Sequence, residues 1–527
     1  MVGFGKEFNN KKRNIKKSTI NNIDKIIHQA FLSHSRGNIK EALKNYKYCI
    51  DQGIDDERIY SNCGLIQKSF GNLKQAEQLL RKAIEINPNS NTAYTNLGTI
   101  LKDLKRFSEA EVCHRKAIEI NPNFSLAFTN LGNVLRELKK FKEAEILFRK
   151  AIQLDPKSTI AHANLGEILK SNGRLKEAKI FLRKAIEINP SFVKAFYSLS
   201  KLSFNNDDIS WQKYLLSEKI LNNKTEKEKI DVYFARSNIL HKSKRYEESA
   251  KNLQIGNQIK LKIYPSNIEK IIELSKLLLN QPNIEKNINS EKKYPCSIFI
   301  VGMPRSGTTL VESIISLNGE VQDLGETNIF EKAYQESIKN DQQLSLTDLY
   351  LQKLRELGIN SSITSNKWLY NYLYAGIIAN QISNSKIIHC FRNPLDNILS
   401  ITRANFSTGN SYSASLVDCA KVYINQEKTM NIYKNRFSSS IYEMDYDVLV
   451  TNPERTIKSL IKWLGWQWNE NYLSPHKNQR TVLTASDVQV RSPINPQSIG
   501  GWKKYKEMLK PAISELSETN RFKDLIT

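Results

Sequence analysis

The sequence predicts an all-α solenoid over residues 23–260, followed by an α/β domain with a central parallel sheet over residues 293–527. In the first half, small residues and prolines recur with a fixed period, which predicts a helical repeat. In the second half, an apolar β-branched run precedes a glycine-framed loop and a stretch with helical spacing. Alternating strand and helix patterns continue to the C-terminus, and this alternation is typical of a parallel sheet.

The repeat in the first half has a period of 34 residues. Glycines, alanines and prolines keep this period, at Gly64, Gly98, Gly132 and Gly166, at Ala76, Ala110, Ala144 and Ala178, and at Pro88, Pro122, Pro156 and Pro190. The pattern resembles the tetratricopeptide repeat (TPR), in which small residues let two helices approach closely and proline ends the second helix. The resemblance implies a TPR solenoid whose concave face binds a peptide or protein. A solenoid that braces the neighbouring domain, or that scaffolds oligomerisation, is the alternative.

The most informative motif begins the second half. Residues 298–301 form an apolar run suited to a buried parallel strand, residues 302–307 form a turn, and helical spacing follows. A strand, a glycine-framed loop and a helix start present several backbone N–H groups to one point, which favours binding of phosphate or sulfate. The spacing is close to Walker A, but Thr308 stands where the lysine belongs, and Arg305 brings a cation into the middle of the loop. The motif therefore predicts an anion other than a nucleoside triphosphate.

The residues of this loop resemble the 5′-phosphosulfate loop of sulfotransferases that use 3′-phosphoadenosine-5′-phosphosulfate (PAPS). They are Pro304, Arg305, Ser306, Gly307, Thr308 and Thr309. The resemblance implies a P-loop-like sulfotransferase fold in which these six residues bind PAPS as co-substrate and Arg305 also takes part in catalysis. An NTPase with a decayed loop is the alternative.

A second motif follows a second buried run, residues 386–391. Arg392-Asn393-Pro394 is followed, eight residues after the arginine, by Ser400. The pair resembles the family's 3′-phosphate motif, and a planar guanidinium suits bidentate binding of phosphate. Taken alone, Arg392 would be interpreted as a surface arginine at a strand end. Its place after the loop and its spacing from Ser400 favour the 3′-phosphate of PAPS.

Two further residues are assigned catalytic roles by the resemblance. Glu326, in Gly325-Glu326-Thr327, stands where tyrosylprotein sulfotransferases carry a general base that takes the acceptor proton. Lys367 matches a family lysine that contacts the transferring group, although Asn366 and Leu369 replace the usual Asp and Pro of the Asp-Lys-x-Pro pattern. The alternatives are a solvated loop glutamate and an exposed lysine.

The C-terminal region carries two more such segments. Residues 486–495 resemble the Ser-x-x-Gln-Val-x-x-Pro stretch of tyrosylprotein sulfotransferases, in which Ser486 stabilises developing charge. Residues 498–505 resemble the segment that closes over the nucleotide, which assigns Trp502 and Lys503 to PAPS binding. Many relatives carry arginine where this chain has Gly501. Core packing is the alternative for Trp502.

Metal and nucleic-acid functions are not expected. The seven histidines and six cysteines show no ligand spacing such as Cys-x-x-Cys, so the sequence predicts no metal site. The net charge is +24, with 78 Lys and Arg against 54 Asp and Glu. Because the lysines are spread along solvated helix faces, and because an anionic co-substrate gives positive potential a use, no nucleic-acid partner is predicted.

The remaining segments predict location. Residues 1–22 are expected to form a basic disordered arm without the apolar region of a secretory signal, and residues 261–292 a linker. No stretch approaches about 18 consecutive apolar residues, so no transmembrane segment is expected. The six scattered cysteines predict a reduced, cytoplasmic setting.

Together these features predict a PAPS-dependent sulfotransferase that moves a sulfuryl group to an acceptor hydroxyl, with the TPR array binding substrate or a partner. A protein tyrosine, a glycan and a small molecule all remain open as acceptors, because a fold does not fix a substrate. The alternative function is a TPR interaction scaffold whose sulfotransferase-like domain binds the nucleotide without turnover.

Overall fold

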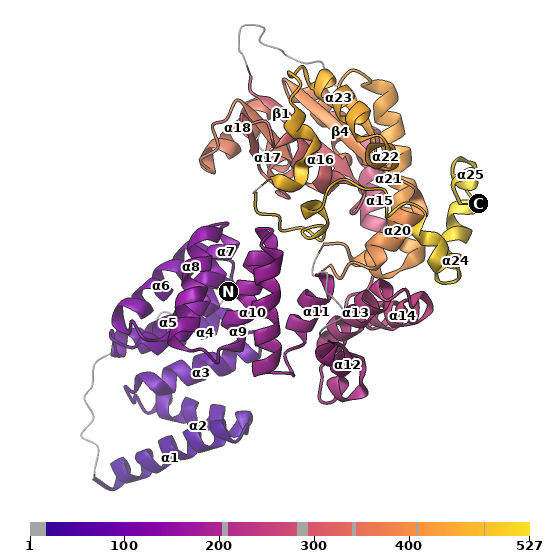
Figure 1. Cartoon of the computed structure of the whole chain (residues 1–527). Helices are drawn as coiled ribbons and strands as arrows, with labels where there is room; N and C mark the ends of the chain where they lie inside the picture. The colour runs from indigo at the N-terminus through magenta and orange to yellow at the C-terminus, as the bar shows by residue number, and fades with distance from the viewer. Residues whose placement is uncertain are drawn as a thin grey trace. The chain divides into compact units, whose positions relative to one another are not determined.

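A computed structural model describes residues 17–202, 209–281, 294–339, 344–406, 409–478 and 480–526. Most of the predicted N-terminal arm, residues 1–16, and part of the predicted linker, residues 282–293, lie outside the described residues. The chain divides into two compact units, Met1–Leu165 and Gly166–Thr527. Figure 1 labels their helices and strands and colours the chain from indigo at the N-terminus to yellow at the C-terminus. The boundary falls inside a helix, so the domain bounds given by the sequence stay predictions.

The first unit is built from helices joined by short turns. They are α1 (Lys17–Ser35), α2 (Ile39–Asp51), α3 (Glu57–Ser69), α4 (Leu73–Ile86), α5 (Asn91–Asp103), α6 (Phe107–Ile120), α7 (Ser125–Glu137), α8 (Phe141–Leu154) and the first part of α9 (Thr159–Ser171). Helix α3 packs on α4, α5 on α6, and α7 on α8. The predicted all-α TPR solenoid is confirmed.

The repeated glycines let the two helices of each repeat touch. A Cβ on Gly98 of α5 would lie 2.7 Å from the ring of His114 on α6, and a Cβ on Gly132 of α7 would lie 2.6 Å from the ring of Phe148 on α8. Real Cβ atoms do not come this close, so a larger residue would push the helices apart. The 34-residue period therefore records one packing contact made again in each repeat.

The second unit begins with further helices. They are α10 (Leu175–Ile188), α11 (Val193–Lys201), α12 (Ser210–Leu216), α13 (Glu226–Lys242) and α14 (Tyr246–Ile263). Thr225 and Glu228 form a capping box that starts α13. Helix α15 (Glu269–Leu279) lies within the stretch predicted as a linker, and its Leu278 is buried in the same core as the sheet residue Phe299. This part of the stretch packs because its apolar residues recur at helical spacing.

A five-stranded sheet forms the centre of the second unit. Its strands are β1 (Cys296–Gly302), β2 (Val321–Asp323), β3 (Ile363–Asn366), β4 (Ser385–Phe391) and β5 (Ile441–Asp445), in the order β2-β3-β1-β4-β5. All neighbouring pairs are parallel. The predicted α/β fold with a central parallel sheet is confirmed.

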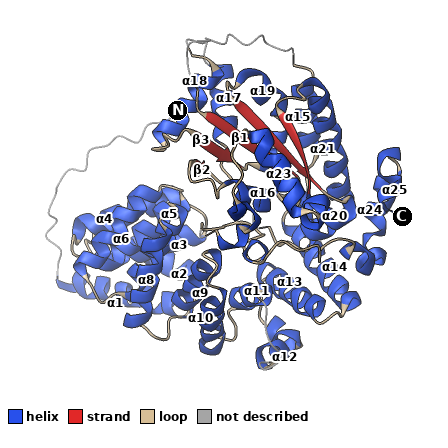
Figure 2. Ribbon diagram, turned by 45° about the horizontal axis from the view of Figure 1, so that its top comes forward, coloured by secondary structure: helices blue, strands red, loops and turns tan. Residues whose placement is uncertain are grey.

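Helices cover both faces of this sheet (Figure 2). Ile298 and Ile300 of β1 pack with α16 (Thr308–Ile315) and α23 (Pro453–Leu464). Phe299 and Val301 point to the opposite face, where they pack with α17 (Ile329–Lys339), α18 (Leu346–Glu356), α19 (Ala375–Gln381) and α21 (Leu416–Arg436). The strand is apolar throughout because successive side chains enter two different cores.

The direction of the strands determines where a site can form. Parallel strands all end at the same edge of the sheet. After β1 the chain continues to β2 and β3 on one side of β1, whereas after β4 it continues to β5 on the other side of β4. The remaining helices, α20 (Pro394–Thr402), α22 (Tyr446–Thr451), α24 (Lys506–Ser517) and α25 (Lys523–Ile526), follow β4 and β5. Within the described residues, no helix is long and apolar enough to cross a membrane.

Candidate active site

The loop after β1 adopts a conformation that few side chains tolerate. Gly307 has a φ of 96°, and a Cβ on Gly302 would lie 2.3 Å from the carbonyl oxygen of Cys390 on β4. Arg305 has a φ of 68°, in the left-handed region that costs a residue with a side chain about 1–2 kcal/mol. The loop therefore lies tightly against β4 and holds its only cation in a strained backbone position.

Arg305 lies among neutral oxygens. Its Nε donates to Oγ of Ser400 at 3.0 Å, Nη1 donates to Oγ of Ser486, and Nη2 donates to Oε1 of Gln489 at 2.5 Å. No carboxylate of the described residues forms an ion pair with it. Burial, and then the nearby charge of Arg392, lowers the pKa of Arg305 to about 10, so the group stays charged at neutral pH. The site thus contains a cation without a paired anion.

The hydroxyl groups of the loop have structural partners. Oγ of Ser306 donates to the Met303 carbonyl at 2.8 Å, which closes the turn. Thr308 and Thr309 are buried at the start of α16, and Oγ1 of Thr309 lies 3.2 Å from Oγ1 of Thr484. The carbonyl of Pro304 accepts from Nδ2 of Asn397 on α20 at 3.0 Å. The backbone N–H groups at the start of α16 are what this loop offers to an anion.

Lys367 and Glu326 are brought together from two strand ends. Lys367 follows β3, its side chain is 1% exposed, and its Nζ donates to Oε1 of Glu326 at 2.6 Å. Burial alone would lower the pKa of Lys367, but Glu312 and Glu326 raise it above the usual value, so the lysine is charged. The Glu326 side chain is 41% exposed, so its carboxylate faces both the lysine and solvent. The pair places a carboxylate and a fixed cation at the same edge as the loop.

Sequence reasoning missed the group that supports this pair. Arg480 Nη2 donates to Oε2 of Glu312 at 2.8 Å, and its Nη1 donates to Oδ2 of Asp323. Glu312 is 1% exposed and lies 3.9 Å from Nζ of Lys367. Burial raises the pKa of Glu312 to about 7, against the lowering effects of Lys367 and Arg480. A glutamate among the apolar residues of α16 was the available signal, because a buried charge needs a partner.

Arg392 lies at the end of β4, as predicted. Its Nη2 donates to the Ser498 carbonyl at 3.1 Å, and its guanidinium lies 4.6 Å from the centre of the Tyr446 ring. The nearest carboxylates, those of Asp396 and Asp447, are 4.0 and 3.9 Å away. In the described part of the chain, its buried Nε has no hydrogen-bond partner. Ser400, the predicted companion of Arg392, contacts Arg305 instead.

The two C-terminal candidates, Trp502 and Lys503, differ in exposure. Trp502 is 3% exposed, and its backbone N–H donates to Oδ1 of Asp396 at 2.9 Å. The N–H of Gly500 donates to Oδ2 of the same carboxylate at 2.7 Å. Lys503 is exposed and lies over the Trp502 ring at 5.8 Å. Asp396 thus fixes this segment on α20, and the Trp502 indole packs in a core with Leu395 and Leu509.

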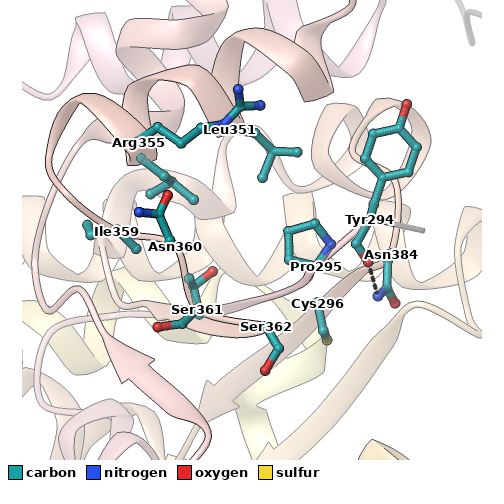
Figure 3. Close-up of a pocket in the computed structure, with 12 residues that line it drawn as sticks. Tyr294, Pro295, Cys296, Leu351, Arg355, Ile359, Asn360, Ser361, Ser362 and Asn384 are labelled. Atoms are coloured by element: carbon teal, nitrogen blue, oxygen red, sulfur yellow. Dashed lines mark hydrogen bonds between the residues drawn. The ribbon is translucent and has the colours of Figure 1, made fainter. Parts of the chain in front are cut away.

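A cavity of about 560 Å³ lies at the other edge of the sheet, where the strands begin (Figure 3). Cys296, Ser362, Thr364 and Asn384 line it, and Nδ2 of Asn384 donates to the Tyr294 carbonyl at 3.0 Å. None of the predicted site residues lines this cavity. The described residues also contain no group of three or more His, Cys, Asp or Glu side chains placed to hold a metal ion.

Comparisons with known proteins agree with this organisation. Residues 295–470 match the model of the sulfotransferase family. Residues 57–90, 92–124, 125–158 and 160–192 match models of the tetratricopeptide repeat. The first match covers the sheet, the loop and Arg392, and it ends before Arg480, Ser486 and Trp502.

Two relatives illustrate the range of similarity. An uncharacterised protein of Aquifex aeolicus (strain VF5) is 32% identical over 244 residues, which cover 42% of this chain and 32% of that protein. Protein-tyrosine sulfotransferase 2 of Gallus gallus is 24% identical over 237 residues, 39% of this chain and 62% of that protein. The chain thus spans about a third and about three fifths of these two relatives. Among solved structures, the crystal structure of MamA is 21% identical over 31% of this chain and 96% of that chain, with a TM-score of 0.28.

Proposed function

We propose that this chain, which carries a sulfotransferase-family domain after a TPR array, transfers a sulfuryl group from PAPS to the hydroxyl of an acceptor. The observation that carries the proposal is the environment of Arg305, a charged guanidinium in a phosphate-type loop that contacts only hydroxyl and amide oxygens. A half-buried cation without a counter-charge favours binding of an anion, and without the Walker lysine the loop lacks its usual reach to the γ-phosphate of a nucleoside triphosphate.

The donor carries negative groups at two ends, and the residues present fit both. Arg305 and the N–H groups at the start of α16 suit the phosphosulfate. Arg392 suits the 3′-phosphate, because its buried Nε lacks a hydrogen-bond partner among the described residues and both neighbouring carboxylates lie beyond hydrogen-bond reach. Ser498 and Tyr446 hold this guanidinium in place.

Bound PAPS supplies the sulfuryl group and a phosphate that leaves. The acceptor oxygen bonds to sulfur, the bond from sulfur to the bridging phosphate oxygen breaks, and its electron pair stays on adenosine 3′,5′-bisphosphate. Glu326 takes the acceptor proton. Lys367 orients that carboxylate and, with Arg305 and Ser486, stabilises negative charge on the oxygens around sulfur and on the leaving phosphate.

The acceptor class that we favour is a tyrosine side chain of a protein, held by the TPR array as a peptide. Two observations support this choice. The chain is similar to proteins named as protein-tyrosine sulfotransferases, and it carries tetratricopeptide repeats, which suit binding of a peptide. Glycan and small-molecule hydroxyls are the alternatives. A cytoplasmic setting stays a prediction from the cysteines.

The test measures PAPS-dependent release of adenosine 3′,5′-bisphosphate with peptide, glycan and small-molecule acceptors. Glu326→Gln should lower transfer by about 10²–10⁴-fold and leave the affinity for the bisphosphate unchanged. Glu320→Gln, on an exposed turn before β2, is the matched control and should transfer like the wild type. Binding of PAPS without release, with every acceptor, would instead support a TPR scaffold with an inactive domain. If the chain hydrolyses ATP and the Arg392→Ala variant does so at the same rate, the result would support an NTPase.

A further inference from the structure

The segment Arg480–Arg491 contacts the transfer site on one side. Ser486 and Gln489 accept hydrogen bonds from Arg305, and Arg480 contacts Glu312 and Asp323 behind Lys367. The segment has little regular structure of its own, a single 3₁₀ turn at Gln489–Arg491. Something other than a helix or strand must therefore hold Ser486 in place.

The same segment also contacts the turn between the two helices of the fourth matched repeat, α9 and α10, and all these contacts fall within the second compact unit. The backbone N–H of Val482 donates to the Ser171 carbonyl at 3.0 Å, and Nη2 of Arg491 donates to the same carbonyl at 2.7 Å. Oγ1 of Thr481 donates to Oδ1 of Asn172 at 2.8 Å. These contacts join the segment to the end of α9 through a backbone N–H, the Arg491 guanidinium and the Thr481 hydroxyl.

The fit at this contact leaves no spare room. Gly173 has a φ of 80°, and a Cβ on it would lie 2.9 Å from Nε of Arg491. Arg491 also donates to the carbonyls of Asn478 and Arg480, each at 2.5 Å. The arginine therefore links the turn after α9 to both ends of the segment.

One ion pair crosses the same contact. Nζ of Lys170, on α9, lies 3.5 Å from Oδ2 of Asp487 and 2.9 Å from Oε2 of Glu167. The side chains of Lys170 and Asp487 are 3% and 10% exposed. Asp487 follows Ser486 directly, and its charge acts on Arg305, where it opposes the lowering of the arginine's pKa. One carboxylate thus pairs with a lysine of the repeat and acts through its charge on the cation of the transfer site.

We propose that Lys170 is a positioning residue for sulfuryl transfer: by pairing with Asp487, it holds Ser486 against Arg305 and keeps the Asp487 carboxylate from becoming the counter-ion of Arg305. The end of the repeat array is then part of the frame of the transfer site. This inference rests on the proposed function. It makes a prediction that simple loss of packing would not, because removing the carboxylate as well as the lysine should restore the free cation.

The test compares Lys170→Met, Asp487→Asn and the double variant, using kcat for sulfuryl transfer and calorimetric affinity for adenosine 3′,5′-bisphosphate. Lys170→Met should lower kcat by about 10–100-fold and weaken bisphosphate binding by about tenfold, because Asp487 then neutralises Arg305. The double variant should return both values to within about threefold of Asp487→Asn. Lys170→Arg should behave like the wild type.

The control is Lys184→Met, on an exposed face of α10, which should change neither value. Melting temperatures identify variants that do not fold, and Lys170→Gln then replaces Lys170→Met with the same expected pattern. The inference is wrong if Lys170→Met matches the wild type, or if the double variant is no better than Lys170→Met. A wild-type protein that binds the bisphosphate but transfers nothing overturns the proposed function alone, because the binding comparison still tests Lys170.

Discussion

The arginines of the repeats and the arginine of the loop face different chemical surroundings. In the array, Nη2 of Arg115 contacts Glu111 at 2.7 Å and Glu143 of the next repeat at 2.5 Å, both carboxylates. In the loop, Arg305 contacts only neutral oxygens. A cation that already has its anion joins parts of the protein, whereas a cation without one is available to a ligand. The contrast is the reason for proposing that Arg305 binds an anion.

The two regions also differ in how far their contacts reach along the chain. A repeat contact joins residues 16 apart, such as Gly132 and Phe148. The site joins Arg305 to Ser486, 181 residues later, because parallel strands gather distant segments at one edge. Local contacts repeat and can be recognised as a period, whereas the site occurs once.

The largest effect that tests this comparison comes from removing the free cation. Arg305→Ala should lower sulfuryl transfer by about 10²–10³-fold, because negative charge around sulfur loses its fixed cation. Arg115→Ala, which removes an arginine of the paired kind, should leave transfer unchanged, because an exposed ion pair contributes little. Steady-state release of adenosine 3′,5′-bisphosphate measures both. Equal losses in the two variants would contradict the comparison.

A smaller effect is expected at the second pocket. Arg392→Lys should weaken binding of adenosine 3′,5′-bisphosphate by about 10–100-fold, because a lysine cannot bind phosphate through two parallel N–H groups. Affinity for AMP, which lacks the 3′-phosphate, should stay the same. Calorimetry with both nucleotides measures the difference. A parallel loss for AMP would mean that Arg392 acts on the fold and not on the 3′-phosphate.

The smallest effect concerns the stability of the repeats. His114 occupies the position of Leu80 and Phe148 in the neighbouring repeats, and neither ring nitrogen has a hydrogen-bond partner among the described residues. Burial lowers the pKa of His114 from 6.5 to about 4. As the pH drops from 6.5 toward 4, His114 is therefore protonated in the unfolded chain but stays neutral in the folded one. The free energy of unfolding falls over this pH range.

His114→Leu should remove this pH dependence, with a difference of about 2 kcal/mol between pH 7 and pH 5. Urea unfolding at the two pH values, followed for the first repeats, provides the measurement. Transfer by the variant at pH 7 should equal that of the wild type. An unchanged pH dependence would show that other groups cause the acid sensitivity.

The sequence alone predicted the features that depend on residues close together along the chain. The 34-residue period predicted the solenoid, and the loop from Gly302 to Thr309 predicted the strand, the turn and the helix start. Arg392 could be assigned to a strand end because an apolar run, residues 386–391, precedes it. No such run precedes Lys367, which was singled out only by the family resemblance. The site roles given to these residues stay predictions.

The features that were not predicted depend on contacts between residues far apart in the sequence or on the orientation of a side chain. Arg480 was missed because its partners Glu312 and Asp323 lie more than 150 residues earlier, and no local pattern marks an arginine that pairs across the fold. Ser400 was assigned to Arg392 by spacing, whereas the helix that carries it turns its hydroxyl toward Arg305. The stretch before β1 was interpreted as a linker from its polar end, although α15 occupies its middle.

At Arg305, the left-handed backbone lowers the stability of the fold, while the side chain is the one proposed to bind the anion. Glycine there would release about 1–2 kcal/mol of strain and would spare a guanidinium the loss of its hydration. A library of this protein selected only for heat tolerance should therefore accumulate glycine at position 305, while the proposed sulfuryl transfer falls as it does in Arg305→Ala. Directed evolution for robustness would need a simultaneous screen for transfer to keep the arginine.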